Sequence, residues 1–123
     1  ALGYPFRNMK KIIDLVGPAK TKEIIFTGRR FSGEEALAMG LINQLVPAAD
    51  LDKVVHELAS TIAANAPLTI LATKVIVAEA AKDPVDRDIA LCDELVENCM
   101  LSEDYKEGRT AFLEKRPPMF KGK

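Results

Sequence analysis

The sequence contains no tryptophan, a single histidine and only two cysteines in 123 residues. The histidine, His56, has no second histidine or cysteine at ligand spacing, so we predict no metal site. Cys92 and Cys99 are seven residues apart, or about 10 Å on a helix, which is too far for a disulfide. Their reduced state favours a cytoplasmic location. Because no run of about 18 apolar residues occurs, we expect no membrane partner.

Aromatic residues are also scarce, at 6%, and the net charge is only −1. The charges are nevertheless uneven: residues 1–30 carry seven basic and two acidic side chains, and residues 103–123 carry six and four. The intervening segment, 31–102, carries four basic and twelve acidic side chains. Basic ends suit a phosphate, a nucleic acid or an acidic partner. Aromatic side chains do not alternate with the basic ones, so we expect no nucleic-acid partner and keep that function as a weaker alternative.

A self-contained active site is missing from the sequence. Gly28-Arg29-Arg30 lacks the glycine spacing and the lysine-serine pair of a phosphate-binding loop. Glu34 and Glu35 resemble a pair of catalytic carboxylates, but Ser32 and Glu35 have the spacing of a helix capping box, which explains them structurally. No strained, glycine-flanked serine suggests a nucleophile. We therefore predict no catalytic residue and no cofactor within this chain.

The periodicity of apolar residues predicts a mainly α fold. The expected helices span residues 7–16, 19–26, 34–39, 51–63, 67–81, 84–100 and 103–115. Proposed breaks include Gly17 and Gly40, and proposed caps include Asp50, Asp83 and Ser102. Residues 41–46 are short, apolar and bounded by glycine and proline, so they form the single candidate strand.

Two helices have patterns that point to packing partners. The segment 67–81 is apolar nearly all round, so we expect it to be buried on most sides. The segment 85–99 carries a narrow apolar stripe at alternating spacings of four and three, which suits packing against another helix or subunit. Gly108 lies within the last predicted helix, where a glycine usually permits a close approach.

Three stretches resemble the crotonase superfamily of enoyl-CoA hydratases and isomerases. Residues 22–47 resemble its helix ending in Thr-Gly, its capped A-x-x-x-G-L turn and its following V/I-N-x-V-V-P segment. Residues 102–117 resemble its S-E-D-x-x-E-G-x-x-A-F-x-E-K-R-x-P motif. The run from Pro67 to Lys74 resembles its P-x-x-x-x-x-x-K helix. The three stretches follow one another along the chain in the same order as in the family, and the match covers essentially residues 1–123.

The resemblance implies the C-terminal helical part of a ββα-spiral fold, with at most one or two short strands. Residues 1–49 would end the core, and residues 50–123 would form a helical cover and trimerisation region. The implied partners are an acyl-CoA substrate, further copies in a trimer or hexamer, and a preceding N-terminal segment. The chain begins Ala1-Leu2-Gly3, without an initiator methionine, so we expect such a segment. Coenzyme A would be part of the substrate, in fatty acid metabolism.

The resemblance also assigns binding positions but no catalytic ones. The family's oxyanion-hole amides and both glutamates lie upstream of residue 1. Phe112 and Lys115 match positions that contact the adenine and phosphate region of CoA, and Val96 matches a position in the acyl pocket. Tyr4 and Pro5 would border the site. Arg7-Asn8 stands where many members have two glycines, which leaves the substrate open.

The implied reaction is hydration of a 2-enoyl-CoA thioester. Isomerisation, dehalogenation, decarboxylation and thioester hydrolysis use the same oxyanion hole and differ upstream, so they remain alternatives. As an isolated chain, the sequence is also that of a non-catalytic helical assembly module.

Overall fold

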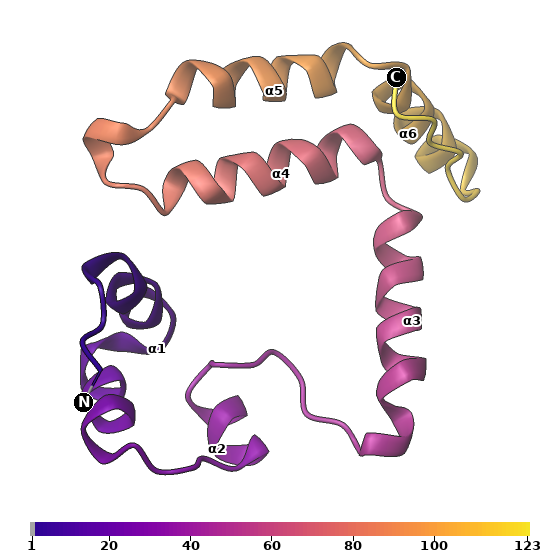
Figure 1. The fold of residues 1–123 in the computed structure, drawn as a ribbon. Coiled ribbons are helices and arrows are strands. Elements are labelled where there is room, and N and C mark those ends of the chain that lie inside the picture. Colours follow the sequence, from indigo (N-terminus) through magenta and orange to yellow (C-terminus); the bar gives the residue numbers. More distant parts are fainter. Residues whose placement is uncertain (1) are drawn as a thin grey trace. The chain divides into compact units, whose positions relative to one another are not determined.

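The computed structural model describes residues 2–123, and within this range the chain is helical without any strand. Figure 1 shows the helices in chain order. The α-helices are α1 (Phe6–Thr27), α2 (Gly33–Ala38), α3 (Leu51–Ala63), α4 (Pro67–Ala80), α5 (Ile89–Leu101) and α6 (Glu103–Glu114), with 3-10 turns η1 (Ala48–Asp50) and η2 (Pro84–Asp86). The predicted mainly α class is confirmed.

The chain divides into two compact units, Ala1–Leu51 and Asp52–Lys123. The first contains α1 and α2, and the second contains nearly all of α3 and the whole of α4, α5 and α6. The roles predicted for residues 1–49 and 50–123, core and assembly, concern contacts with other chain segments, so they stay predictions.

The first helix is bent at the predicted break. Gly17 has φ 79° and ψ 166°, which is not helical, and Pro18 follows it inside α1. Only glycine adopts this backbone conformation readily, and proline fits the first turn that follows it. The Thr21 hydroxyl donates to the Gly17 carbonyl at 2.8 Å, and Thr21 is buried. The break therefore has its own local support.

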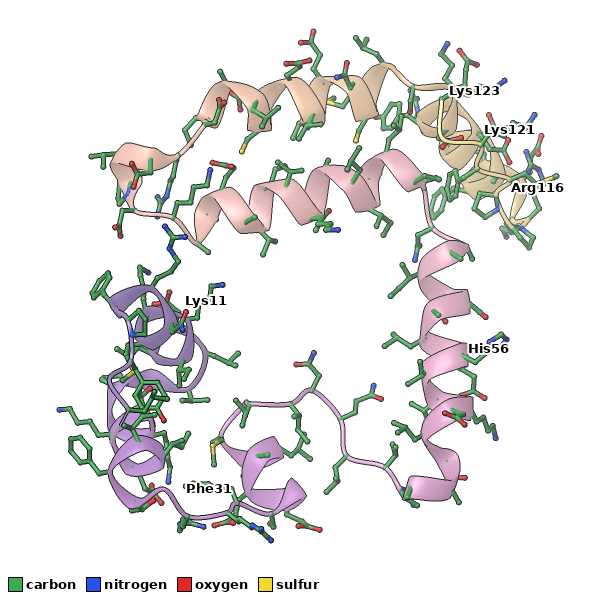
Figure 2. All side chains as sticks on the ribbon, in the orientation of Figure 1. Lys11, Phe31, His56, Arg116, Lys121 and Lys123 are labelled. Carbon is green, nitrogen blue, oxygen red and sulfur yellow. The ribbon has the colours of Figure 1, made fainter. Side chains whose placement is uncertain are left out.

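The predicted capping box starts α2. The Ser32 hydroxyl accepts from the Glu35 amide at 3.2 Å, and the Ser32 amide donates to the Glu35 carboxylate at 2.8 Å. Arg29 donates to the same carboxylate and to Glu23 on α1, and it lies 3.7 Å over the ring of Phe31, which Figure 2 labels. The hydrogen bond from Arg29 is the largest cause that lowers the pKa of Glu35 to about 2, and the hydrogen bond from the Ser32 amide is the next largest. These contacts tie the end of α1 to α2.

The strand predicted at residues 41–46 is wrong. After Gly40, which adopts φ 78° as expected, the segment is irregular coil. A strand needs a neighbour to pair its backbone N–H and C=O groups, and none is present among residues 2–123.

The start of α5 also differs from the prediction. Asp83 precedes only the 3-10 turn η2, and the helix begins six residues later, where the Asp88 carboxylate accepts from the Leu91 amide at 2.9 Å. Glu79 at the end of α4 accepts from the Asp88 amide at 2.9 Å and from Lys82 at 2.6 Å. This buried carboxylate holds the turn between α4 and α5, so the two helices lie antiparallel, side by side (Figure 1).

Most large apolar side chains are uncovered. The buried apolar residues among 2–123 are only Ala72 and Ala111, whereas Leu71 on α4 is 50% exposed and Val77 is 63% exposed. The expectation that this helix is buried on most sides is therefore wrong for this chain, because α5 covers only one of its faces. The α3 helix likewise exposes a row of apolar residues, namely Leu51, Val55, Leu58 and Ile62.

Among residues 2–123, no single helix is long and apolar enough to cross a membrane. The pair Ala48–Ala63 and Pro67–Ala80 reaches that length and composition together, but it is bent by 106°.

Candidate functional site

The second unit contains an apolar pocket of about 590 Å³ between α4, α5, α6 and the C-terminal tail, residues 117–123. Its walls are mostly aliphatic and aromatic, with a few polar groups from threonine, serine, arginine and aspartate. This volume lies within the roughly 300–1,000 Å³ typical of small-molecule sites. We name it the apolar pocket.

Each wall follows from the spacing of residues on one helix. On α4, Leu68, Ala72 and Ile76 lie four residues apart and so share a face. On α6, Tyr105 and Phe112 are seven residues apart on the face that also holds Gly108 and Arg109. The tail closes a further side with Phe120.

Two of the predicted binding residues meet in this pocket. Val96 on α5 and Phe112 on α6 both line it. Val96 is 46% exposed and Phe112 is 83% exposed, so the pocket is open on their side. The resemblance had assigned these residues to different ends of a CoA thioester, and the structure brings them to one cavity. Their roles stay predictions.

The other predicted residues lie elsewhere. Tyr4 and Pro5 are exposed, belong to the first unit and precede α1. Lys115 is exposed at the C-terminal end of α6 and does not line the apolar pocket. Its φ of 55° is the sole positive value among the described non-glycine residues. Lys115 therefore ends α6 in the left-handed conformation, which sequence reasoning missed because this position is usually a glycine.

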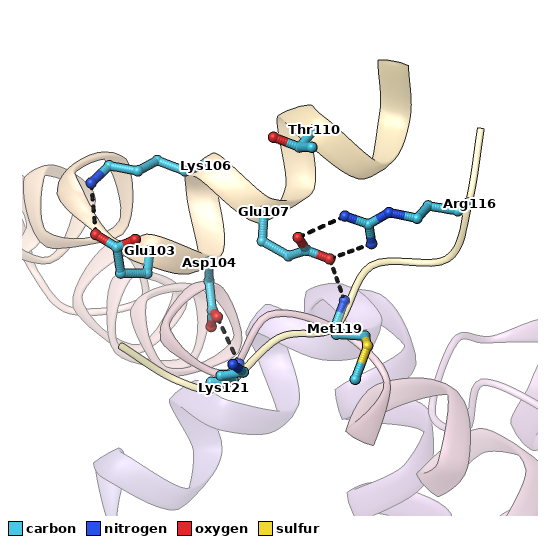
Figure 3. A pocket seen from close by; sticks show the side chains of 8 residues that line it. All are labelled: Glu103, Asp104, Lys106, Glu107, Thr110, Arg116, Met119 and Lys121. Atoms are coloured by element: carbon cyan, nitrogen blue, oxygen red, sulfur yellow. Dashed lines mark hydrogen bonds and ion pairs between the residues drawn. The ribbon is translucent and has the colours of Figure 1, made fainter. Parts of the chain in front are cut away.

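A second pocket, also of about 590 Å³, lies on the polar side of α6 (Figure 3). Arg116 donates to both carboxylate oxygens of Glu107, at 2.6 and 2.9 Å, and Lys106 donates to Glu103 at 2.6 Å. Hydrogen bonds from Arg116 and from the Met119 amide lower the pKa of Glu107 to about 2. The hydrogen bond between Arg116 and Glu107 is the largest cause that raises the pKa of Arg116, and the hydrogen bond with Glu114 is the next largest. Since these charged side chains pair with one another, we interpret the hollow as the place where the tail is attached to α6, and not as a binding site.

The tail is fixed mainly by Asp104, which is only 3% exposed. Its carboxylate accepts from the Lys121 amide at 2.6 Å and from the Gly122 amide at 2.7 Å. Asp104 lies in the first turn of α6, where the sequence alone indicates only a favourable interaction of its charge with the helix dipole. The tail contacts lie 17 and 18 residues away, a separation at which no sequence periodicity gives a signal.

The described residues supply no metal centre and no recognised catalytic group. Among residues 2–123, no three His, Cys, Asp or Glu side chains are arranged to hold a metal ion. His56 lies exposed on α3, where Figure 2 shows its ring directed away from the helix. Cys92 and Cys99 are both free thiols, as their spacing predicted.

Comparison with known proteins tests the resemblance. The sequence model for the family described as Enoyl-CoA hydratase/isomerase matches residues 4–123. A short-chain-enoyl-CoA hydratase of Clostridium acetobutylicum is 32% identical over 90% of this chain and 42% of its own length. A carnitinyl-CoA dehydratase of Salmonella typhi is 38% identical over 89% of this chain and 43% of its own.

Solved structures agree. An enoyl-CoA hydratase/carnithine racemase from Magnetospirillum magneticum superposes with a TM-score of 0.88 at 32% identity, covering 100% of this chain and 45% of its own. A putative enoyl-CoA hydratase/isomerase family protein from Hyphomonas neptunium gives 0.83 at 34% identity, with 99% and 46% covered. The chain thus spans less than half the length of these relatives. The resemblance to the crotonase superfamily is confirmed, and the chain belongs to the enoyl-CoA hydratase/isomerase family.

Proposed function

We propose that this chain is the C-terminal helical part of an enzyme that hydrates 2-enoyl-CoA thioesters, and that the apolar pocket receives the acyl portion. The observation that carries the proposal is the apolar lining of the pocket that contains Val96, the residue implied for the acyl pocket, in a chain matched by the family over residues 4–123. An alkyl chain is the part of the thioester that gains most from such walls.

The chemistry itself would come from outside residues 1–123. The family resemblance places the oxyanion hole and the two glutamates in a preceding segment. Such a segment would also cover apolar side chains that the chain leaves exposed, such as Leu71 and Val77 on α4. A folded monomer rarely leaves so much apolar surface open to water.

Hydration of crotonyl-CoA tests the reaction. We expect the full-length protein to hydrate crotonyl-CoA, so that the absorbance of the conjugated thioester falls. The isolated residues 1–123 should leave this absorbance unchanged. Turnover by the pure isolated chain would contradict the location of the active site. A full-length protein that binds crotonyl-CoA without hydrating it, but moves its double bond or cleaves its thioester, would favour the isomerase or hydrolase alternative.

A second role, assembly, is supported by the exposed apolar row on α3. Leu51, Val55 and Leu58 recur on one helix face at spacings of four and three, and each is more than half exposed. We propose that this row joins copies of the protein into a trimer or hexamer. Analytical ultracentrifugation of the full-length protein should show such a species, and Val55→Asp should dissociate it. An oligomer unaffected by Val55→Asp would contradict this surface.

The two free thiols support a reducing compartment, and we propose a cytoplasmic location for the protein.

A further inference from the structure

The C-terminal tail is attached to α6 at two points that flank a single aromatic residue. On one side of Phe120, the Met119 amide donates to Glu107 at 2.8 Å. On the other side, the Lys121 amide donates to Asp104 at 2.6 Å. The backbone of Phe120 is therefore held on both sides by carboxylates from α6, and these lie one helical turn apart.

The attachment at Asp104 is the more complete of the two. Both carboxylate oxygens are used, by the Lys121 and Gly122 amides, and the Asp104 amide donates in turn to the Lys123 carbonyl at 3.1 Å. Asp104 is 3% exposed, so water competes little for these bonds. Hydrogen bonds to an ionised carboxylate are among the stronger ones in proteins.

The anchored tail reaches both sides of the apolar pocket. The ring of Phe120 lies against Gly108 on α6, where an added β-carbon would stand 3.5 Å from its Cε1 atom. At Gly122 an added β-carbon would stand 3.5 Å from Cβ of Pro67, the first residue of α4. The tail therefore spans from α6 to the start of α4, and Phe120 forms part of the pocket lining between them.

We propose that Phe120 is a specificity-determining residue of the apolar pocket, limiting the length of the acyl chain that it accepts, and that Asp104 is its positioning residue. This inference rests on the proposed function, in which the acyl portion of a CoA thioester occupies the pocket. The ring of Phe120 takes up space that further methylene groups would otherwise fill. Each methylene that gains a buried place strengthens binding about fourfold, so space for two would give roughly tenfold or more.

The test measures the dissociation constants of butyryl-CoA and decanoyl-CoA for the full-length protein by calorimetry. Both thioesters are saturated, so no double bond is available for hydration. We expect Phe120→Ala to shift the ratio of the two constants about tenfold towards decanoyl-CoA, and Phe120→Trp to shift it the other way. Asp104→Asn should shift the ratio in the same direction as Phe120→Ala. The Lys121 and Gly122 amides each donate to a different oxygen of Asp104, and the asparagine amide has only one oxygen that can accept.

Glu103→Gln is the matched control. Glu103 neighbours Asp104 on α6, is exposed, pairs with Lys106 at 2.6 Å and does not line the apolar pocket. We expect this variant to keep the wild-type ratio. A purely structural role for the tail would lower thermal stability in Asp104→Asn and leave the ratio unchanged, which would remove Asp104 from its proposed role.

The outcomes separate the two proposals. If the wild-type protein binds neither thioester, the proposed function fails and this inference fails with it. If the wild type binds both and neither Phe120→Ala nor Phe120→Trp changes the ratio, the inference alone is overturned. Where Phe120→Ala does not fold, Phe120→Leu and Phe120→Trp decide: a ratio that follows side-chain volume supports the inference, and a constant ratio ends it.

Discussion

The ring of Phe120 lies against Gly108, at a distance where a methyl group on Gly108 would just touch it. The added β-carbon would be 3.5 Å from Cε1 and 3.8 Å from Cζ of the ring, which is ordinary van der Waals contact. Gly108, which lies in the middle of α6, thus permits the close approach predicted for it, and the approaching group is the Phe120 ring of the tail.

Gly108→Ala is expected to stabilise the protein. Alanine favours a helix interior over glycine by roughly 1 kcal/mol, and the space at Gly108 accepts its methyl group. Gly108→Leu, in contrast, would displace Phe120 because its longer side chain needs the position of the ring. Chemical denaturation of the full-length protein should place Ala above the wild type and Leu below it. A less stable Gly108→Ala would mean that the ring lies closer to α6 than described.

A pH dependence follows from the ion pair of Glu107 with Arg116. The carboxylate has a pKa of about 2 in the folded chain, lower than its ordinary 4.5. Its contribution to the attachment of the tail is therefore complete above about pH 4.5 and is lost as the pH falls towards 2. The Met119 amide, which donates to Glu107, should show this as a chemical-shift change on acidification in NMR spectra.

The matched comparison for this titration is a pair of variants. Glu107→Gln should abolish the pH-dependent shift of the Met119 amide, because the amide side chain does not titrate. Glu94→Gln, an exposed substitution on α5, should leave it intact. A shift that persists in Glu107→Gln would contradict the assignment of this titration to Glu107.

The capping box at the start of α2 gives a prediction in the first unit. Ser32→Ala removes the acceptor for the Glu35 amide and should cost about 1 kcal/mol of local stability. Hydrogen exchange of the amides of residues 33–38 should quicken about fivefold. Ser32→Asp is the control, since its carboxylate restores the acceptor at the same position. Equal protection in the wild type and in Ser32→Ala would contradict the box.

The features that the sequence predicted correctly are those with a local signature. The break at Gly17, the box of Ser32 and Glu35 and the cap at Ser102 each depend on residues within four positions, and all are present. Asp83 and Asp88 are both residues that commonly cap a helix, so the sequence does not say which of them starts α5. In the structure Asp88 does, and its amide donates to Glu79 across the turn. That contact spans nine residues, beyond the reach of local patterns.

The candidate site divides in the same way. Motif resemblance suggests Phe112 and Val96 as binding residues, and both line the apolar pocket. The sequence gives no sign that Asp104 holds the tail or that Phe120 lines the same pocket, because both features arise from a tail that folds back on α6. The expected burial of α4 failed for a related reason. An all-round apolar helix signals that neighbours exist, but it does not say whether those neighbours belong to residues 2–123.

Lys115 offers a prediction in which charge and backbone conformation have to be separated. If its ammonium binds the phosphate region of CoA, Lys115→Ala in the full-length enzyme should raise KM for the enoyl-CoA about three- to tenfold with little change in kcat. However, Lys115 also ends α6 with φ 55°, a conformation that alanine tolerates poorly. Lys115→Gly removes the same charge while suiting this conformation, and Lys115→Arg keeps the charge.

A binding role therefore requires that Ala and Gly raise KM equally and that Arg leaves it near the wild-type value. If Ala alone raises KM, the residue acts through the end of the helix. An unchanged KM in both Ala and Gly would remove Lys115 from the CoA site.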